Sequence, residues 1–525
     1  MAASYLESPT NTAGGDVRLG SSEKLTRRAS LNIVALLLDY FAKIAVGLVI
    51  TPILVSGLGR SLYGLWEILG RLIGYMSATD GRPTEALRLI IANEQAIDDP
   101  ASKRRLIGGA LGVWILFLPI LTTVGGIVVW ITPTIAKVSP ESYASVRLTA
   151  ALLAINFLLA NLAALPESVL RGMNLGYKRM GLQAGLTLVG GFLTAGAIYL
   201  GAGLIGVAGA QVALTALTAL LFWHVVKKYI PWFGLVKPGR TEVRRLLKLS
   251  VWNTVGTVIA KVQLTSDVLI LGIIASASMV STYVLTGYAA QAVTGILTLA
   301  ISAVSPGLAG LIGGNQFEKT NALRKEILEI NWLLLTAVGS TILLWNRSFL
   351  HLWVGDQYYA GLWANLLIIL QMVQTSFIRT DAYLIDANLK LHDRVIVNLV
   401  AAVLSVVAAI VLTPRLGIIG LCLGMLGGRM VQTILFPRMI TSYLGRSRSF
   451  SLKTIARPAL VMALLFVTAS YIGQRILAYN WIEWSALVIA SIAITTLVAM
   501  IIGLPFESRS RINKRMRLIL KSTFT

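Results

Sequence analysis

The chain has 525 residues, of which 56% are hydrophobic and 13% charged, and its formal net charge is +23. So few charges exclude an ordinary soluble domain, and the apolar residues fall into repeated runs of about 20, enough for a helix to cross a bilayer. The composition therefore indicates a polytopic membrane protein whose basic residues lie mostly in loops, and no nucleic-acid partner is expected.

Cysteine and histidine are too sparse for a metal cluster. The single cysteine, Cys422, lies in an apolar segment, which excludes an intramolecular disulfide. The three histidines, His224, His351 and His392, are far apart in the sequence. We expect no metal site, no catalytic residue and no cofactor; coupling to a proton or a sodium ion stays open.

Residues 1–29 are polar, contain Gly and Ser, and carry the basic segment LTRR near their end. They predict a disordered cytoplasmic tail. The apolar run that follows, Leu31–Val55, is too long for the core of a signal peptide, so we expect it to be retained as a membrane span.

Ionisable pairs lie near the middle of the first two apolar runs: Asp39 with Lys43, and Glu67 with Arg71. A charge at this depth costs about 2.5 to 3.5 kcal/mol, so such side chains normally face a protein interior or a watery cavity. In both pairs the acid precedes the base by four residues, which places them on one helix face. Two interpretations stay open. The pairs neutralise each other and hold neighbouring helices together, or Lys43 and Arg71 line a cavity for an anionic substrate.

Fourteen spans can be drawn, and their length predicts helices instead of the short alternating strands of a membrane barrel. They start near Leu31, Leu62, Leu106, Val146, Met180, Leu204, Leu249, Val280, Ile330, Ala360, Val395, Ile418, Ile455 and Trp481. Of the 46 Lys and Arg residues, 36 lie on one side in the alternate connections and both tails, 6 lie on the other side, and the rest lie within spans. The positive-inside rule makes the rich side cytoplasmic, with both termini there.

Two parts of the chain resemble each other. GLIGVAGAQV at residues 203–212 aligns with GIIGLCLGML at residues 417–426, an offset of 214, and Tyr63 of LYGLW aligns with Tyr283 of TYVLT at an offset of 220. The matches predict an all-α protein with two parallel six-helix lobes, and such transporters commonly place the substrate between the lobes. The predicted parts are a tail at 1–29, an N-terminal lobe at 30–228, a basic cytoplasmic linker at 229–248, a C-terminal lobe at 249–445, helices 13 and 14 at 446–505, and a basic cytoplasmic tail at 506–525.

Polar residues in the middle of spans of one lobe align with polar residues in the other lobe. Lys261 follows Lys43 by 218 residues, and at an offset of 220 Arg71 aligns with Gln291. Asp267 lies six residues after Lys261, roughly 240° around the helix, so it is less clearly a partner for that lysine. The predicted substrate-binding residues of a central cavity are Lys43, Arg71, Lys261 and Gln291, and the predicted charge partners or ion-coupling groups are Asp39, Glu67 and Asp267. We expect Arg429, Gln371 and Gln374 to make structural hydrogen bonds between helices.

Four motifs together resemble the Wzx-type polysaccharide flippases of the multidrug/oligosaccharidyl-lipid/polysaccharide (MOP) exporter superfamily. They are LYGLW at residue 62, LRGMNLGYKRMGLQA at residue 170, GLIGVAGAQV at residue 203 and KKYIPWFG at residue 227. The resemblance covers about residues 30–445. The stretch TDGRPTEA around Asp80 departs from it, and Pro83 is expected to end the helix early there.

The resemblance implies a two-lobed exporter with alternating access and a cationic central cavity, in the bacterial plasma (inner) membrane. The implied substrate is an undecaprenyl-diphosphate-linked oligosaccharide, moved from the cytoplasmic to the periplasmic leaflet for polysaccharide biosynthesis. Membrane lipids, a polysaccharide polymerase and glycosyltransferases are the implied partners. A diphosphate needs compensating cations to cross about 30 Å of hydrocarbon, and the predicted Arg and Lys side chains can supply them.

Three alternatives are weighed against this interpretation. A murein-precursor (lipid II) flippase would use the same cations, and a MATE-type cation-coupled drug exporter would use Asp39 as its ion carboxylate. A membrane glycosyltransferase, polymerase or ligase would need acidic or histidine side chains on external loops. The external connections offer little beyond Glu141, His351, Asp356 and Glu483. We therefore do not expect an enzyme.

Overall fold

The computed structural model describes residues 15–95, 97, 99–388, 391–444 and 452–511, and in these ranges the chain is almost entirely helical, without a strand. The helices are α1 (Gly15–Met76), α2 (Pro83–Asn93), α3 (Pro100–Ile135), α4 (Tyr143–Gly172), α5 (Met180–Tyr199), α6 (Gly203–Tyr229), α7 (Arg240–Ile274), α8 (Ala277–Thr286), α9 (Tyr288–Gly313), α10 (Phe317–Trp353), α11 (Leu362–Ala387), α12 (Leu391–Leu444), α13 (Leu452–Gly473) and α14 (Trp481–Val498). Four short helical turns are η1 (Pro140–Ser142), η2 (Gly176–Arg179), η3 (Asp356–Tyr358) and η4 (Ala499–Gly503).

Ten helices of the described residues are long and apolar enough to cross a membrane, or eleven if α8 and α9, which meet at 53°, form one bent span. Two of the ten, α1 and α12, are broken at a glycine: φ is 75° at Gly59 and 57° at Gly417. Glycine adopts such angles readily because it has no Cβ. Each of these helices is therefore two segments joined by a sharp turn. The all-α polytopic fold is confirmed, while the number of fourteen spans stays a prediction.

The helix boundaries refine the predicted segments. Helix α1 begins at Gly15, inside the predicted tail, and α7 begins at Arg240, inside the predicted linker. Pro83 does not end a membrane helix as expected: α1 ends earlier, at Met76, and Pro83 occupies the first turn of α2. Proline fits there because a first-turn residue needs no backbone N–H bond. Residues 1–14, 445–451 and 512–525 of the predicted tails and of the junction before α13 lie outside the described residues.

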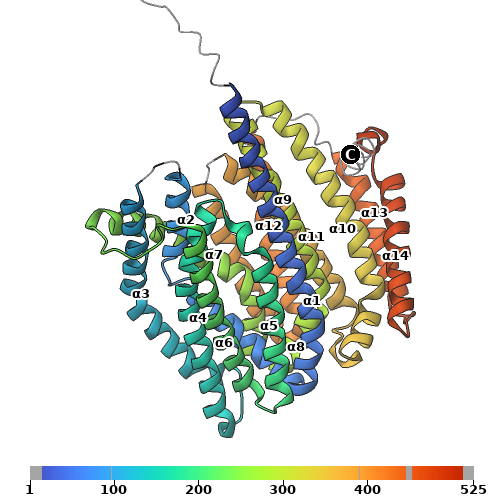
Figure 1. Cartoon of the computed structure of the whole chain (residues 1–525). Coiled ribbons are helices and arrows are strands. Elements are labelled where there is room, and N and C mark those ends of the chain that lie inside the picture. Colours follow the sequence, from blue (N-terminus) through green and yellow to red (C-terminus); the bar gives the residue numbers. More distant parts are fainter. Residues whose placement is uncertain (1–14, 96, 98, 389–390, 445–451, 512–525) are drawn as a thin grey trace, which may run out of the picture.

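The helices form one bundle, and α1 runs along its front in Figure 1. We keep the name N-terminal lobe for α1–α6 and C-terminal lobe for α7–α12. Helix α1 packs against α5 of its own lobe and against α8 of the other, while α13 and α14 pack against α10 at the edge of the bundle. We call the end of the bundle that holds the turn between α2 and α3 the basic end, and the end that holds Gly59 and Gly417 the opposite end.

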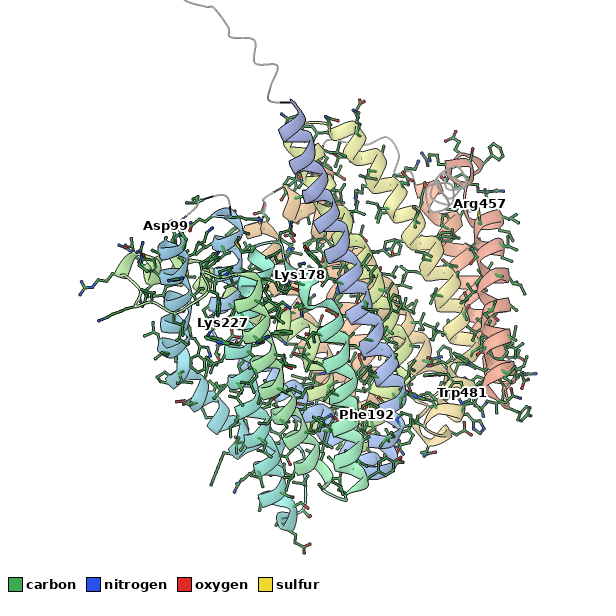
Figure 2. All side chains as sticks on the ribbon, in the orientation of Figure 1. Asp99, Lys178, Phe192, Lys227, Arg457 and Trp481 are labelled. Carbon is green, nitrogen blue, oxygen red and sulfur yellow. The ribbon has the colours of Figure 1, made fainter. Side chains whose placement is uncertain are left out.

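The outer surface is apolar along most of its height. Phe192 is 77% exposed, and it lies with Trp481 toward the opposite end in Figure 2, whereas Lys178, Lys227 and Arg457 lie toward the basic end. Exposed aromatic and aliphatic side chains on this scale are expected where lipid, not water, is the solvent.

The buried core is continuous at one end of the bundle and divided at the other. Near the opposite end one apolar cluster joins both lobes, with members such as Leu69, Leu153, Leu271, Leu350 and Leu421. At the basic end there are two clusters: Ile91, Leu106 and Val169 belong to one, which also takes in Leu246 at the start of α7, and Leu384, Phe436 and Ile440 belong to the other. The lobes therefore share a core at the opposite end, and toward the basic end their cores are separate except that the start of α7 packs with the N-terminal lobe.

Candidate functional site

Hydrogen bonds between α1 and α8 join the lobes at the opposite end. Arg60 Nη2 donates to Thr282 Oγ1 at 2.6 Å, and Ser281 Oγ donates to the Arg60 carbonyl at 2.5 Å. A Cβ on Gly64 would stand 1.7 Å from the carbonyl oxygen of Ala277, so the backbones can approach this closely only because residue 64 is glycine. This contact closes the space between the lobes at the opposite end.

Arg71 and Lys261 come together where the shared core ends. Arg71 on α1 and Lys261 on α7 interact electrostatically, and both are partly exposed. A Cβ on Gly74 would stand 3.7 Å from Lys261 Nζ, so the lysine lies against the same stretch of α1. The hydroxyl of Tyr75 lies 2.7 Å from Ser266 Oγ and holds the two helices together beside the cations. Two like charges at this depth favour an anion between or beside them.

Asp80 is the carboxylate that the structure places near Lys261. It lies in the turn after α1, is 6% exposed, and accepts a hydrogen bond from the Arg82 N–H at 3.0 Å. Burial raises the pKa of Asp80 above its ordinary value, although the Arg82 N–H and the charges of Arg82 and Lys261 act to lower it. The acidic neighbour of Lys261 is therefore Asp80, in the turn after α1, and not Asp267 of its own helix.

Glu67 and Arg71 interact as the four-residue spacing predicts, and the hydroxyl of Tyr63 on the preceding turn also interacts with Glu67. The pair is thus local to α1. Arg71 interacts with this carboxylate and with Lys261 of α7.

Lys43 is exposed although it lies in the middle of α1. The outward face of this segment is marked by Val34, Phe41 and Val49, which are 52%, 53% and 64% exposed. Lys43 is two residues from Phe41, about 200° around the helix, so it faces the bundle interior. Its exposure there means that it borders open space.

Gln291 on α9 faces α1 and is also exposed. Its neighbours one turn away touch α1: the hydroxyl of Tyr288 donates to the Ile44 carbonyl at 3.4 Å, and Gly295 lies against Tyr40. Gln291 therefore projects from the C-terminal lobe toward the helix that carries Lys43.

Asp39 has a partner that the sequence did not suggest. It is 8% exposed and lies 4.0 Å from Arg179 of η2, which in turn pairs with Glu167 of α4 at 3.0 Å. Lys43 adds a weaker electrostatic interaction. Asp39 thus belongs to a network that ties α1, α4 and η2 together within the N-terminal lobe.

Asp267 points away from Lys261. Its carboxylate accepts a hydrogen bond from the Tyr283 hydroxyl at 2.8 Å and interacts with Arg429. Arg429 donates to Thr375 Oγ1 and to the Gln263 carbonyl, each at 3.0 Å, as expected of a residue that joins helices. The structure therefore separates Asp267 from the central cations.

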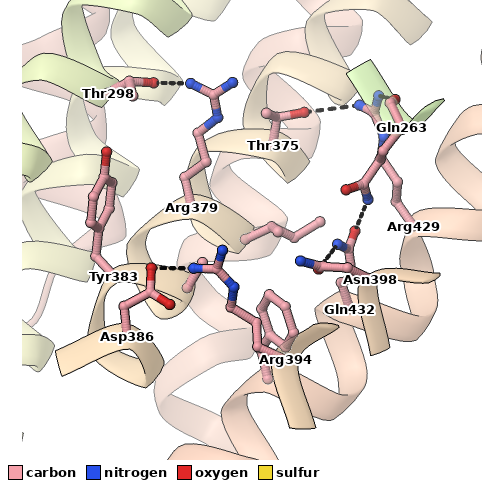
Figure 3. A pocket seen from close by; sticks show the side chains of 13 residues that line it. Gln263, Thr298, Thr375, Arg379, Tyr383, Asp386, Arg394, Asn398, Arg429 and Gln432 are labelled. Carbon is pink, nitrogen blue, oxygen red and sulfur yellow. Dashed lines mark hydrogen bonds and ion pairs between the residues drawn. The ribbon is translucent and has the colours of Figure 1, made fainter. Parts of the chain in front are cut away.

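A second polar region lies inside the C-terminal lobe (Figure 3). It is a cavity of about 290 Å³ between α7, α9, α11 and α12, and three arginines, Arg379, Arg394 and Arg429, line it. The positive-inside count includes Arg379 and Arg394 among the 36 basic residues of the cytoplasmic side, because a count of basic residues per connection does not show which side chains turn back into the bundle.

A larger groove of about 700 Å³ lies between α10, α11, α12 and α13. Much of its wall is apolar, with Leu328, Trp332, Phe377 and Met462 among the lining residues, and Arg324 and Asp381 lie at one side. Its dimensions and lining suit a hydrocarbon chain more than a sugar.

A bundle of long apolar helices with cations between its two lobes is the fold of a polytopic membrane protein. The chain belongs to the polysaccharide biosynthesis protein family, whose sequence profile matches residues 31–311.

Solved transporters share the fold. A lipid II flippase MurJ in an inward closed conformation superposes with a TM-score of 0.63 at 14% identity, over 89% of this chain and 98% of that one. An inward-facing multidrug resistance MATE family transporter of the MOP superfamily has a TM-score of 0.61 at 15% identity, over 78% of this chain and 96% of that one. An outward-facing structure of such a transporter has a TM-score of 0.52 at 15% identity, over 81% and 96%. No curated protein sequence matches the chain.

Proposed function

We propose that this protein carries a lipid-linked oligosaccharide diphosphate, of the undecaprenyl type, from the cytoplasmic to the periplasmic leaflet of a bacterial plasma membrane for polysaccharide biosynthesis. One observation supports this most: the lobes share a core at the opposite end and divide toward the basic end, with Arg71 and Lys261 where the shared core ends. The basic end is the cytoplasmic one in this proposal, by the positive-inside rule.

Arg71, Lys261, Lys43 and Gln291 bind the diphosphate and the first sugar in this proposal. Arg71 offers a planar fork to phosphate oxygens, and the lysines act as point charges. Glu67 interacts with Arg71 and Asp80 interacts with Lys261, so each cation has a nearby carboxylate in this structure. The ligand displaces these carboxylates, which lowers the cost of bringing a diphosphate into the bundle.

Transport requires the lobes to separate at the opposite end and close at the basic end. The hydrogen bonds of Arg60 to Thr282 and Ser281 are few, so opening this end chiefly requires the apolar contacts of the shared core between the lobes to part, and each lobe can stay folded. The apolar groove beside α10 and α13 offers the lipid chain a place next to the C-terminal lobe while the head group crosses.

The proposal is tested in a strain that lacks the gene and is complemented with variants. Arg71→Ala and Lys261→Ala are expected to abolish surface polysaccharide while the protein stays in the membrane at normal levels. Arg147→Ala is the matched control, since Arg147 stacks on Trp130, 4.1 Å from the ring centre, away from the central cations. Normal polysaccharide in both central variants would refute the proposal.

The same strain separates the alternatives. Accumulation of lipid-linked murein precursor with lysis, and intact surface polysaccharide, would identify a lipid II flippase. A changed drug susceptibility alone would identify a drug exporter. Ala variants of Asp356, which lies 3.0 Å from His351, and of Glu483 are expected to export normally, because the family and the fold are those of transporters.

A further inference from the structure

The arginine-lined cavity of the C-terminal lobe is separate from the central cations. Lys261 and Gln263 are two residues apart on α7, about 200° around the helix. Lys261 faces Gly74 of α1, whereas Gln263 donates to the Gln432 side chain at 2.5 Å on the cavity side. Helix α7 therefore stands between the two regions, and a ligand in one does not touch the other.

Within the described part of the chain, Arg379 is a cation without a carboxylate partner. Its Nη1 donates to Thr298 Oγ1 at 2.5 Å, and among the described residues no acidic side chain interacts with it. A guanidinium has five N–H donors and no acceptor, so most of its hydrogen-bonding capacity remains for a ligand. Leaving such a group partly desolvated without a counter-charge is costly.

The other two arginines line the same cavity. Arg429 is 9% exposed, and its Nε has no hydrogen-bond partner in the described chain. Arg394 pairs with Asp386, yet its Nε is also without one. Asp386 neutralises the Arg394 guanidinium, and Asp267 interacts with Arg429. Arg379 therefore supplies the positive charge of the cavity that no carboxylate balances among the described residues.

A chain of amides holds the wall of the cavity in place. Gln263 donates to Gln432, and Gln432 Nε2 donates to Asn398 Oδ1 at 2.6 Å, which links α7 to both segments of α12. The wall is thus built from side chains that bond each other, and the arginine donors are left over. Figure 3 shows these side chains around one space.

We propose that this cavity is a binding site for a phosphate group, distinct from the central site. Three guanidinium groups arranged around one space suit a tetrahedral oxyanion, which accepts hydrogen bonds in several directions, whereas one arginine alone saturates a planar carboxylate. A volume of about 290 Å³ holds a phosphate or a small phosphomonoester but not an oligosaccharide. Asp386 and Arg394, beside the end of α11 and the start of α12, place its entrance at the basic end.

The phosphate has two possible sources, free inorganic phosphate and the head group of a phosphomonoester lipid. The test uses the purified full-length protein in an uncharged detergent. Binding of radiolabelled inorganic phosphate is measured by equilibrium dialysis at constant ionic strength, with chloride as the reference anion. A parallel series measures the shift of the melting temperature with short-chain phosphatidate. Saturable binding in the first series points to free phosphate, and a shift in the second alone points to lipid; each supports the site.

The variants decide whether this cavity is the place of binding. Arg379→Gln is expected to weaken binding at least about tenfold, and Arg379→Lys to weaken it less, because lysine keeps the charge and loses the fork. The double variant Arg71→Gln with Lys261→Gln is expected to keep the binding, which separates this inference from the proposed transport function. Arg347→Gln is the control for the loss of one positive charge and should keep the binding. Arg347 donates to the Gln474 carbonyl and does not line the cavity. A single symmetric elution peak establishes that each variant is folded.

Equal affinity in Arg379→Gln and the unchanged protein would overturn the proposal, and so would loss of binding in the central double variant alone. The absence of both phosphate binding and a phosphatidate shift would overturn it as well.

Discussion

Gly203 and Gly417, which are 214 residues apart, have nearly the same positive φ, 55° and 57°. Gly203 begins α6, and Gly417 breaks α12 between its two segments. Both glycines therefore turn the chain at the opposite end, at the positions that the sequence repeat aligns. In each lobe, a glycine with positive φ lies at a turn where the chain reverses direction between two membrane helices.

Gly417→Ala is expected to lower the stability of the protein by about 1 to 3 kcal/mol, because a side chain is strained at this φ. Nothing lies within 4 Å of the position a Cβ would take, so the loss would come from the backbone alone. Gly427→Ala in the same helix is the control: it also has open space around it and no positive φ, and it should be neutral or slightly stabilising. Melting temperatures in detergent compare the two. Equal losses would contradict the backbone explanation.

Gly64→Ala is expected to keep the lobes from closing at the opposite end, since its Cβ would overlap the Ala277 carbonyl. Transport should fall by an order of magnitude or more, while the fold of each lobe persists. Accessibility of a cysteine placed at Ser278, in a background with Cys422→Ser, should rise. Gly70→Ala, on the same segment of α1 with nothing within 4 Å, should change neither. Unaltered labelling in the Gly64 variant would count against this closure.

Most of the fold could be predicted from the sequence, because long apolar runs indicate membrane helices and the basic residues of the connections indicate their orientation. The intrahelical pair Glu67 and Arg71 was also predictable, since residues four apart share a helix face. The partners across helices were not. Periodicity shows which face a residue occupies but not which helix packs there, so Arg179 as the neighbour of Asp39 came only with the structure.

The same limit explains the second cavity. Arg379 was counted with a cytoplasmic connection because it lies close to the end of an apolar run, and at a helix end a long side chain can turn toward water or back into the bundle. The choice depends on Thr298, which is 81 residues away in sequence. The roles of Lys43, Arg71, Lys261 and Gln291 stay predictions, although the geometry brings Arg71 and Lys261 together.

Asp80→Asn is expected to stabilise the protein at neutral pH. Burial raises the pKa of Asp80, so the folded state favours the protonated carboxyl, and stability is lost as the pH rises through this raised pKa. Asparagine stays neutral and still offers an oxygen to the Arg82 N–H. The variant and the unchanged protein should therefore melt alike below the ordinary pKa of aspartate and diverge at higher pH. A gap independent of pH would rule out this explanation.

Glu85 provides a control of opposite sign. Burial acts to raise its pKa, but the hydrogen bonds and the charge of Arg88 outweigh it and leave the pKa lowered. Ionised Glu85 therefore contributes stability above its ordinary pKa, and this contribution disappears as the pH falls through the lowered value. Glu85→Gln should destabilise the protein at neutral pH, with the difference closing in acid. Melting temperatures of both variants, measured over the same pH range, test the opposite stability changes expected for Asp80→Asn and Glu85→Gln.

Arg324 and Asp381 form a buried ion pair between α10 and α11, 4% and 5% exposed, with Arg324 Nη2 2.8 Å from Asp381 Oδ1. Asp381→Asn is expected to cost about 3 to 5 kcal/mol, because it removes the negative charge that Asp381 places against the buried Arg324 guanidinium. Replacing both residues, Arg324→Met with Asp381→Leu, should recover much of that loss, since no charge then remains buried. Arg245→Gln, which breaks a surface pair with Glu94 whose arginine side chain is 51% exposed, should cost at most about 1 kcal/mol. Denaturation in mixed micelles measures all three. A double variant as unstable as Asp381→Asn would show that packing around these side chains, and not charge, holds α10 against α11.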